Sequence, residues 1–399
     1  MNNLKRKKIL FVISRFPYPL IGGDKIKSYY LMKHLAKHYD VTLAAISFNN
    51  IPDQKDFQPL LDLGLKVYTL PVKPIKDGMK AALMLHKIYP LEVAFYLKKD
   101  FQQLIDKLCE ENDFDYGISF FLRAAEYLKD KKFKKILISE DCRVLYQTRS
   151  YQNTSNIFQK GVRWWEVMKL KKYEPQIVEK FDAVTLVTND DIAAMKSQNP
   201  KPKYRLVTNG VNVEQFVPPA DNSTRKDILF TGKLSVWSNT LMAIKTAKEI
   251  MPLIWEKYPD VKLHLVGSNP VPAIKELESE KIKVHGSVPD IAKYYKECKI
   301  FLHPHLAATG IQNKLLEAMS AGMASVTTQT GIQGIDGIDG EHFLIGSTNQ
   351  EMADRTVQLL QDDDLYNKIT KNARQLILDT HTWDIVNQQI DKVIDEISK

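Results

Sequence analysis

Short apolar runs alternate with longer stretches of helical periodicity in the first half of the chain. The runs are rich in β-branched residues, which favours strands. Strands are expected at residues 9–14, 41–46, 67–70, 116–121, 135–139, 183–187 and 204–207. A helical pattern follows the first of them, at residues 24–38. Strands and helices that alternate in this way predict a parallel α/β sheet.

The pattern starts again in the second half. Strands are expected at residues 227–230, 262–266, 282–284 and 299–303, and helices at residues 239–257 and 313–321. Between the halves, Val-Pro-Pro-Ala-Asp-Asn-Ser at residues 217–223 interrupts the periodicity. A chain of 399 residues also exceeds the size of one hydrophobic core. We therefore predict two doubly wound, Rossmann-like domains, at residues 1–217 and 218–380.

Residues 381–399 form one more amphipathic pattern, with an apolar stripe made of Ile385, Ile390, Val393 and Ile397. We expect one helix here, which crosses back to pack on the N-terminal domain.

The composition is that of an ordered globular chain, with 44% hydrophobic and 26% charged residues. The basic start is followed by a short apolar run without a cleavage site, so a first strand is expected there rather than a signal peptide. No stretch approaches the ~20 apolar residues of a membrane span. Three scattered cysteines, Cys109, Cys142 and Cys298, lack metal or redox spacing. These features favour a reducing cytoplasm.

The charge is distributed unevenly. Residues 1–217 hold 36 Lys or Arg and 24 Asp or Glu, a net charge of +12, whereas the remainder holds 20 and 24, a net charge of −4. A basic half is typical of proteins that meet a polyanion or a membrane surface. A solvated basic surface explains the same numbers equally well.

The clearest candidate for chemistry is the segment Gly310 to Gly322, GIQNKLLEAMSAG. A helix over residues 313–321 would place Asn313, Lys314 and Glu317 on one face, with Gly322 ending it. Its free N-terminal N–H groups, with Gly310 allowing close approach, could hold a phosphate or sugar hydroxyls. An ordinary Lys-Glu surface pair is the simpler alternative.

Three further loops follow expected strands. Gly232 and Lys233 form a turn that suits an anion, Gly267 lies in a turn that could line a base pocket, and Gly22-Gly23 precede the first helix. Taken singly, a solvated lysine or a plain loop accounts for each of them. The first loop also lacks the full G-x-G-x-x-G pattern, so a dinucleotide site is not indicated.

Three other motifs resemble functional sites, but their sequence context favours structural roles. Asp113-Phe114-Asp115 resembles a metal-binding D-x-D but precedes its strand. His303-Pro304-His305 has no third metal ligand nearby in sequence, which favours packing or a solvent contact. Trp164-Trp165 could lie at a membrane interface, but we expect it in the core.

Taken in order, a series of segments resembles the family-four retaining glycosyltransferases of GT-B fold. The series is GGDKIKSYYLMKHLAKHYDVTL, FDAVTLVTNDD, LVTNGVNVEQFVP, ILFTGKL, LHLVGS, KVHGSVPDIAKYYKECKIFLHP and GIQNKLLEAMSAGMASVTT. It spans nearly the whole chain, and its G-I-Q-N-K-x-L-E-A-M segment is similar to bacterial enzymes of exopolysaccharide or capsule assembly. The resemblance implies two Rossmann-like domains facing a central cleft.

The resemblance also implies residue roles. Glu317 matches the second glutamate of an E-x7-E motif that holds the donor ribose, and Lys233 matches a basic residue that contacts the diphosphate. Lys314 is a further phosphate candidate, and all three are the expected catalytic residues. Gly232, Gly267, Thr309, Gly310, Gln312 and Asn313 complete the expected donor site. Gly22 and Gly23 match a loop near the donor phosphates and the acceptor.

Two positions depart from the family pattern. Thr309 stands where the first glutamate of E-x7-E would be, and Ser238, beside Asn239, stands where a second diphosphate-binding lysine is expected. The usual acceptor-domain histidine is also unclear, because Glu140 and Asp141 follow the middle strand instead. We take Asp141 as a candidate acceptor contact.

The resemblance implies a retaining transferase that uses a nucleotide-diphosphate sugar as donor, and we expect it to need no metal and no cofactor. The leaving diphosphate gains negative charge, which Lys233, Lys314 and the helix N-terminus could stabilise. A catalytically inactive GT-B scaffold of a polysaccharide-synthesis complex is the alternative that Thr309 and Ser238 motivate. A nucleotide-sugar 2-epimerase would need acid and base residues that the segment does not offer.

The basic N-terminal half suits a saccharide acceptor carried on a lipid pyrophosphate at the inner leaflet of the cytoplasmic membrane. Candidate contacts are Lys25, Lys33 and Lys37 with Tyr29 and Tyr30, and residues 80–87 with Leu83, Met84 and Leu85. A nucleic-acid partner is not expected, because the lysines lack interleaved aromatic residues.

Overall fold

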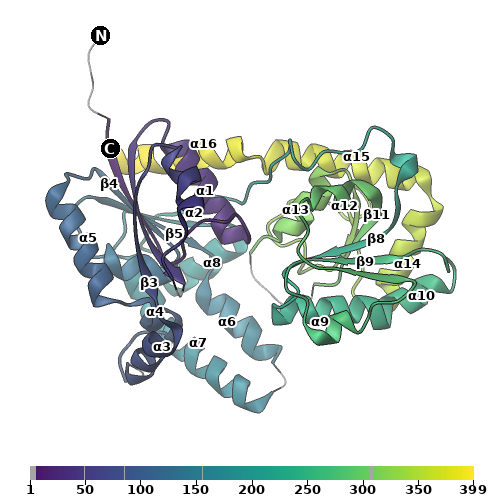
Figure 1. Ribbon diagram of the computed structural model, residues 1–399, viewed down its shortest axis with the longest axis horizontal. Coiled ribbons are helices and arrows are strands. Elements are labelled where there is room, and N and C mark those ends of the chain that lie inside the picture. Colours follow the sequence, from purple (N-terminus) through teal and green to yellow (C-terminus); the bar gives the residue numbers. More distant parts are fainter. Residues whose placement is uncertain (1–5, 49, 85, 155, 306–309) are drawn as a thin grey trace, which may run out of the picture. The chain divides into compact units, whose positions relative to one another are not determined.

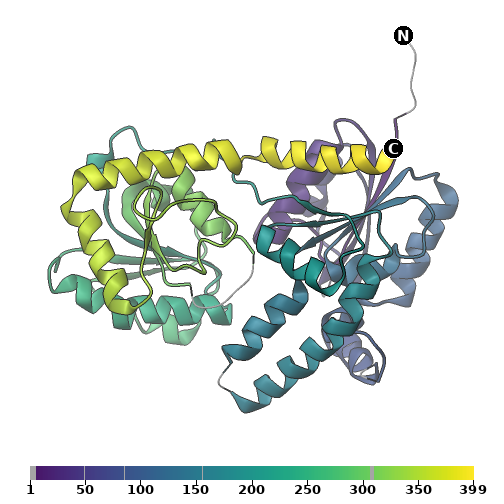
Figure 2. The ribbon, with the colours of Figure 1, turned by 180° about the vertical axis from the view of Figure 1, so that it is seen from behind.

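The computed structural model describes residues 6–48, 50–84, 86–154, 156–305 and 310–399. The chain divides into two compact units (Figures 1 and 2). The first unit comprises residues up to Val207 together with Asn387–Lys399, and the second unit comprises Thr208–Val386. Within the described ranges, no helix has the length and apolar character needed to cross a membrane.

The first unit is built on a seven-stranded, fully parallel sheet of order β3-β2-β1-β4-β5-β6-β7. Its strands are β1 (Lys8–Ile13), β2 (Asp40–Phe48), β3 (Lys66–Val72), β4 (Tyr116–Phe120), β5 (Lys134–Glu140), β6 (Ala183–Leu186) and β7 (Tyr204–Leu206). Both faces of the central strands are covered, which explains why β1 and β4 are continuous apolar runs. The strand order reverses between β1 and β4.

Helices connect these strands. They are α1 (Gly23–Leu35), α2 (Gln54–Leu61), α3 (Pro74–Leu83), α4 (Leu91–Tyr96), α5 (Lys99–Glu111), the 3₁₀ helix η1 (Leu122–Tyr127), α6 (Arg143–Gln152), α7 (Ile157–Val178) and α8 (Asn189–Gln198). Helices α6 and α7 run side by side as a hairpin (Figure 2).

The second unit repeats this plan with six parallel strands in the order β10-β9-β8-β11-β12-β13. They are β8 (Lys226–Thr231), β9 (Leu263–Val266), β10 (Ile282–His285), β11 (Cys298–His303), β12 (Ala324–Thr327) and β13 (Leu344–Ile345). Here the order reverses between β8 and β11. Ligands of doubly wound sheets bind at this kind of reversal, beyond the carboxyl ends of the strands.

The second unit's helices pack on both faces of its sheet. They are η2 (Asn222–Thr224), α9 (Trp237–Lys245), a π-helical turn η3 (Thr246–Ile250), α10 (Met251–Trp255), α11 (Pro272–Lys275), α12 (Ala292–Glu297), α13 (Asn313–Ser320), α14 (Asn349–Gln361) and α15 (Asp363–Thr380). Figure 1 shows α9 and α10 along one face and α12 and α13 along the other. The two Rossmann-like sheets confirm the predicted fold class.

The boundary between the units lies after Val207, ten residues before the predicted boundary at Val217. The reason is that the intervening segment bonds to the second unit. Asn209 donates to Asn313 at 2.9 Å, and the Phe216 carbonyl accepts from Ser320 at 2.8 Å. The prolines at 218 and 219 therefore lie inside the second unit rather than between the two.

The final helix, α16 (Trp383–Ser398), begins in the second unit, and its residues from Asn387 onward belong to the first. Asp391 accepts from the His34 ring of α1 at 2.9 Å, and Glu396 pairs with Arg205 at 2.7 Å. The stripe residues Ile390, Val393 and Ile397 are buried.

The prediction of a core position for Trp164-Trp165 is wrong for Trp164, which is 54% exposed. Helix α7 buries a different face, on which Val167 and Leu170 lie. Trp165 is half-buried, with the Lys169 ammonium 5.0 Å from its ring. An isolated pair of tryptophans does not say which helix face the sheet covers.

Candidate functional site

The carboxyl ends of β8 and β9 touch each other at two glycines. A side chain on Gly267 would place its Cβ 1.6 Å from the Gly232 carbonyl oxygen, so the position requires glycine. The Leu234 amide donates to the Ser268 carbonyl at 2.9 Å and fixes the two turns together. Lys233 directly follows Gly232 and has an exposed side chain.

Helix α13 begins on the other side of the strand-order reversal, after β11. Its N-cap is Gln312, whose side chain makes no capping hydrogen bond. Gly310 has φ 79°, a conformation that favours glycine, and Gly322, with φ 60°, ends the helix as predicted. The expected partner of these residues, Thr309, lies outside the described residues.

Lys314 and Glu317 share the half-buried face of α13, while Leu316 and Met319 are buried as expected. The Lys314 ammonium donates to Asn239 Oδ1 at 2.8 Å, and Asn239 Nδ2 donates to the Lys233 carbonyl at 3.1 Å. Helices α9 and α13, which follow β8 and β11, thus bring side chains to one place.

Burial dominates the ionisation of this pair. It raises the pKa of Glu317 to about 7, although the Tyr295 hydroxyl and Lys314 act in the other direction. Burial lowers the pKa of Lys314 to about 8, against the attraction of Glu317. Paired titratable groups whose pKa values approach neutrality are typical of functional sites.

A buried tyrosine, Tyr295 of α12, holds Glu317 in place. Its hydroxyl donates to Glu317 Oε2 at 2.9 Å and shares a 2.8 Å hydrogen bond with Thr231 at the end of β8. Neither residue was assigned a role from the sequence. Tyr295 stands in one of the quoted segments, but a tyrosine on a helix after a strand carries no signal of its own.

Two stacked imidazoles lie close enough to Lys314 to feel its charge. His303 and His305 are buried, with ring centroids 5.1 Å apart, and His303 also stacks on Phe230 at 6.4 Å. Burial, followed by the charge of Lys314, lowers the pKa of His305 to about 3, so the ring is neutral. Among the described residues, no group of three or more potential ligands could hold a metal ion.

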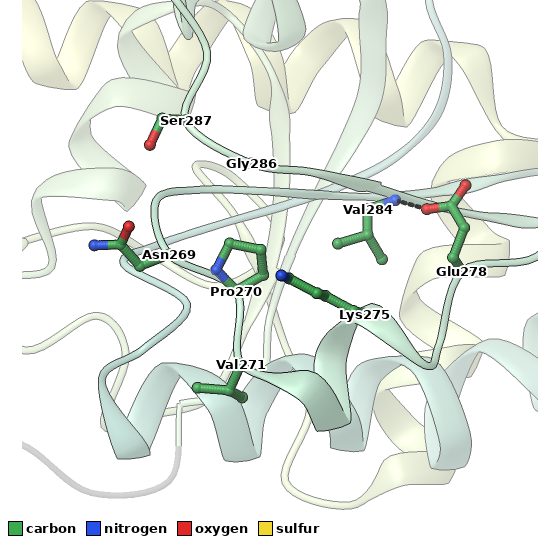
Figure 3. Close-up of a pocket in the computed structure, with 8 residues that line it drawn as sticks. All are labelled: Asn269, Pro270, Val271, Lys275, Glu278, Val284, Gly286 and Ser287. Atoms are coloured by element: carbon green, nitrogen blue, oxygen red, sulfur yellow. Dashed lines mark hydrogen bonds between the residues drawn. The ribbon is translucent and has the colours of Figure 1, made fainter.

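An open cavity of about 770 Å³ lies at the same edge of the second sheet (Figure 3). Asn269, Pro270 and Val271, which follow the Gly267 turn, form part of its wall. Val284 and Ser287, from the end of β10 and the loop beyond it, also line it. The charged side chains of Lys275 and Glu278 line it as well.

The residues predicted for the acceptor lie in the first unit. Gly22 precedes α1 with φ 108°, and Gly23 is the first residue of that helix. Asp141 follows β5 and pairs with Arg143 at 3.3 Å. All three therefore lie beyond the carboxyl ends of the first sheet.

The comparisons with known proteins identify part of the chain. Residues 225–362 match the family described as glycosyl transferases group 1. This match lies within the second unit and covers most of it. The chain is also 22% identical over 393 residues to a 44.6 kDa protein of the cps region of Klebsiella pneumoniae, covering 94% of this chain and 96% of that one.

Solved structures show the same GT-B fold for this chain. Sucrose-phosphate synthase from Thermosynechococcus elongatus superposes with a TM-score of 0.74 at 15% identity, covering 98% of this chain and 99% of that one. Anabaena HepE in complex with UDP-glucose has a TM-score of 0.68 at 14% identity, covering 98% and 99%. The predicted GT-B architecture is confirmed.

Proposed function

We propose that this protein moves a sugar from a nucleotide-diphosphate sugar to a saccharide or lipid-linked saccharide acceptor in the synthesis of a bacterial cell-surface polysaccharide. The observation that carries the proposal is the Lys314–Glu317 pair, half-buried on α13 at the strand-order reversal of the glycosyltransferase domain. The relative from a cps region supports the cell-surface role.

We assign each part of the donor to a group of residues. Glu317, oriented by Tyr295, would accept hydrogen bonds from the ribose hydroxyls. Lys314, Lys233 and the N–H groups at the start of α13 would bind the diphosphate. The cavity beside Asn269 would hold the base. Since HepE was solved with UDP-glucose, UDP-sugars are the first donors to test.

The proposed reaction breaks the bond between the anomeric carbon and the diphosphate oxygen and forms one to the acceptor oxygen. The acceptor proton passes to the departing phosphate oxygen on the same face, which retains the configuration. Lys314 and Lys233 would stabilise the growing negative charge without a metal. No protein nucleophile is required.

Two variants of α13 test this proposal. Lys314→Ala and Glu317→Ala should each lower transfer strongly, because removal of one charged stabilising group costs roughly 2.7–4 kcal/mol of barrier, or 10²–10³ in rate. Release of nucleoside diphosphate from UDP-glucose and other nucleotide sugars is the measurement. Lys226→Ala, an exposed lysine of the same unit, is the control.

Near-normal turnover in both α13 variants would refute the site. If the wild-type chain binds nucleotide sugars but releases no diphosphate with any acceptor, the inactive scaffold becomes the better account. A nucleotide-sugar 2-epimerase would instead interconvert donors without an acceptor.

We also propose that the first unit associates with anionic membranes through α3. Ile75, Met79 and Leu83 are four residues apart and 82%, 61% and 76% exposed, so they form one apolar stripe. Lys76 and Lys80 flank the stripe and are also exposed. This combination is typical of helices that lie in a membrane interface. Of the other predicted contacts, Leu85 lies outside the described residues.

Liposome flotation tests the membrane proposal. We expect binding to vesicles that contain phosphatidylglycerol, weakened by salt, and lost when Met79 and Leu83 are both replaced by Ser. The double variant Leu61→Ser with Phe48→Ser removes exposed apolar area elsewhere in the same unit and should leave binding unchanged. Binding that depends on neither lipid charge nor salt concentration would contradict the membrane proposal.

A further inference from the structure

The first sheet, like the second, has a strand-order reversal, and charged residues of opposite sign surround it. Strands β1 and β4 are neighbours there, with Ile13 opposite Phe120. Arg15 follows β1, and Arg123 lies in η1 directly after β4. The two guanidinium groups therefore flank the edge at which doubly wound sheets bind ligands.

The two arginines share one carboxylate. Asp24, in the first turn of α1, lies 3.3 Å from Arg15 Nη1 and 3.9 Å from Arg123 Nη2. Among the residues that the structure describes, no other carboxylate lies within ion-pair distance of either group. The neighbouring Arg143 differs, because Glu92 binds it through two contacts of 2.8 and 2.9 Å.

Arg123 is poorly satisfied for a buried cation. Its side chain is 13% exposed and lies over the Phe121 ring, with its central carbon 4.4 Å from the ring centroid. Its Nε donates to Ser14 Oγ at 2.5 Å. Burial, and after it the charge of Arg15, lowers the pKa of Arg123. A second anion would supply acceptors for the remaining N–H groups of both forks.

The backbone around this edge is strained. Phe121 has φ 70° and Glu140, at the end of β5, has φ 71°. Bulky residues rarely adopt this left-handed conformation, and such positions gather at functional sites. Two of them at neighbouring strand ends indicate that this edge is shaped for a ligand rather than for packing alone.

We propose that Arg15 and Arg123 bind a phosphate ester of the acceptor substrate, with Asp24 and Ser14 orienting the two side chains. A phosphate offers enough oxygens to accept from both guanidinium forks at once. This inference rests on the proposed transferase function, since it gives that reaction an anionic acceptor. Arg15, with a side chain 51% exposed, is the entry side of the site.

Binding of a soluble sugar phosphate and of a lipid phosphate tests the proposal on the full chain. Glucose 6-phosphate is titrated by calorimetry, and vesicles of phosphatidylcholine with phosphatidic acid are titrated against vesicles with phosphatidylglycerol. We expect the wild type to bind at least one phosphate probe, and Arg15→Gln and Arg123→Gln each to lose about tenfold in affinity. Preference for one probe identifies the source of the phosphate.

Several control variants separate loss of the phosphate site from other effects of substitution. Lys107→Gln removes an exposed charge from α5 and should change nothing. Arg123→Lys keeps the charge but loses the fork, and should bind weakly. Arg15→Gln changes an exposed side chain, so its phosphate affinity can be measured even if Arg123→Gln fails to fold. Unchanged phosphate affinity in both glutamine variants, or a wild type that binds neither probe, would overturn the site.

UDP affinity separates this inference from the proposed function. We expect Arg15→Gln to bind UDP as the wild type does, and Lys314→Ala to lose UDP but keep the phosphate probe. A parallel loss of UDP affinity in Arg15→Gln would assign the arginines to the donor and refute the acceptor site. A wild type that binds phosphate but not UDP would instead refute the donor site alone.

Discussion

At the residue scale, Lys314 and Glu317 are held in an environment that disfavours both charges. Burial is the largest influence on each pKa, and it outweighs their mutual attraction. Tyr295 donates one hydrogen bond to Glu317, and Asn239 accepts one from Lys314. A ligand that brings phosphates and hydroxyls would give the pair further hydrogen bonds. A residue that is buried in this way to bind a ligand lowers the stability of the ligand-free protein.

We therefore expect Glu317→Gln to stabilise the protein while it impairs transfer. The pKa of Glu317 is raised to about 7 in the fold, above the ordinary value near 4.5. Its contribution to stability is therefore present below about pH 4.5 and lost as the pH rises through about 7. Glutamine still accepts from Tyr295 but cannot ionise. The variant should match the wild type near pH 5 and melt higher at pH 8, by roughly 2–4 °C per kcal/mol.

Thermal unfolding of both proteins across this pH range is the measurement. Glu280→Gln, an exposed residue of the same unit, should show no pH-dependent difference from the wild type. A Glu317→Gln protein that melts lower than the wild type at pH 8 would mean that the charged carboxylate is stabilising, against the direction of its pKa.

At the element scale, α13 is anchored at its C-terminal end by a buried arginine. The Arg225 guanidinium donates to the carbonyls of Tyr295 at 3.0 Å and Ala321 at 2.6 Å, and also to that of Gly322. It binds the ends of α12 and α13 together, where the helix dipoles are negative. The position of Glu317 relative to Tyr295 depends on this contact.

Arg225→Met should therefore destabilise the second unit. Methionine keeps much of the aliphatic volume but leaves several carbonyls without a donor, at a cost of roughly 3 kcal/mol or more. Urea unfolding measures the loss, and donor affinity should fall with it because α12 and α13 are no longer fixed. Lys226→Met removes the next, exposed charge and should have little effect. Equal stability of the two variants would show that the carbonyls find other donors.

The strands and helices were predictable because the periodicity is local. The pattern at residues 313–321 and the stop at Gly322 predicted α13 almost to the residue. The supporting contacts were not predictable, because Arg225 and Tyr295 reach α13 from segments distant in sequence. The core position predicted for Trp164 was wrong for the same reason, since the sequence does not tell which face of α7 is covered. The roles of all the predicted site residues stay predictions, those of Lys314, Glu317 and Lys233 included.

At the scale of the whole molecule, the two units are linked by a helix that both use. Residues from Asn387 onward complete the first unit, although they are the last of the chain. Their aliphatic side chains at 390, 393, 394 and 397 are buried. The last segment of the first unit therefore follows the whole of the second unit in the sequence.

Removal of residues 387–399 should unfold the first unit and spare the second. Four buried aliphatic side chains contribute roughly 1.5–3 kcal/mol each, a total comparable with the stability of a whole domain. The proposed donor site lies within Thr208–Val386, so UDP should still raise the melting temperature of the remaining transition. Calorimetry with and without UDP measures both effects. Ile394→Asp, which keeps the chain length, should weaken the same transition as the truncation. If UDP no longer stabilised the truncated chain, its binding would need the first unit as well.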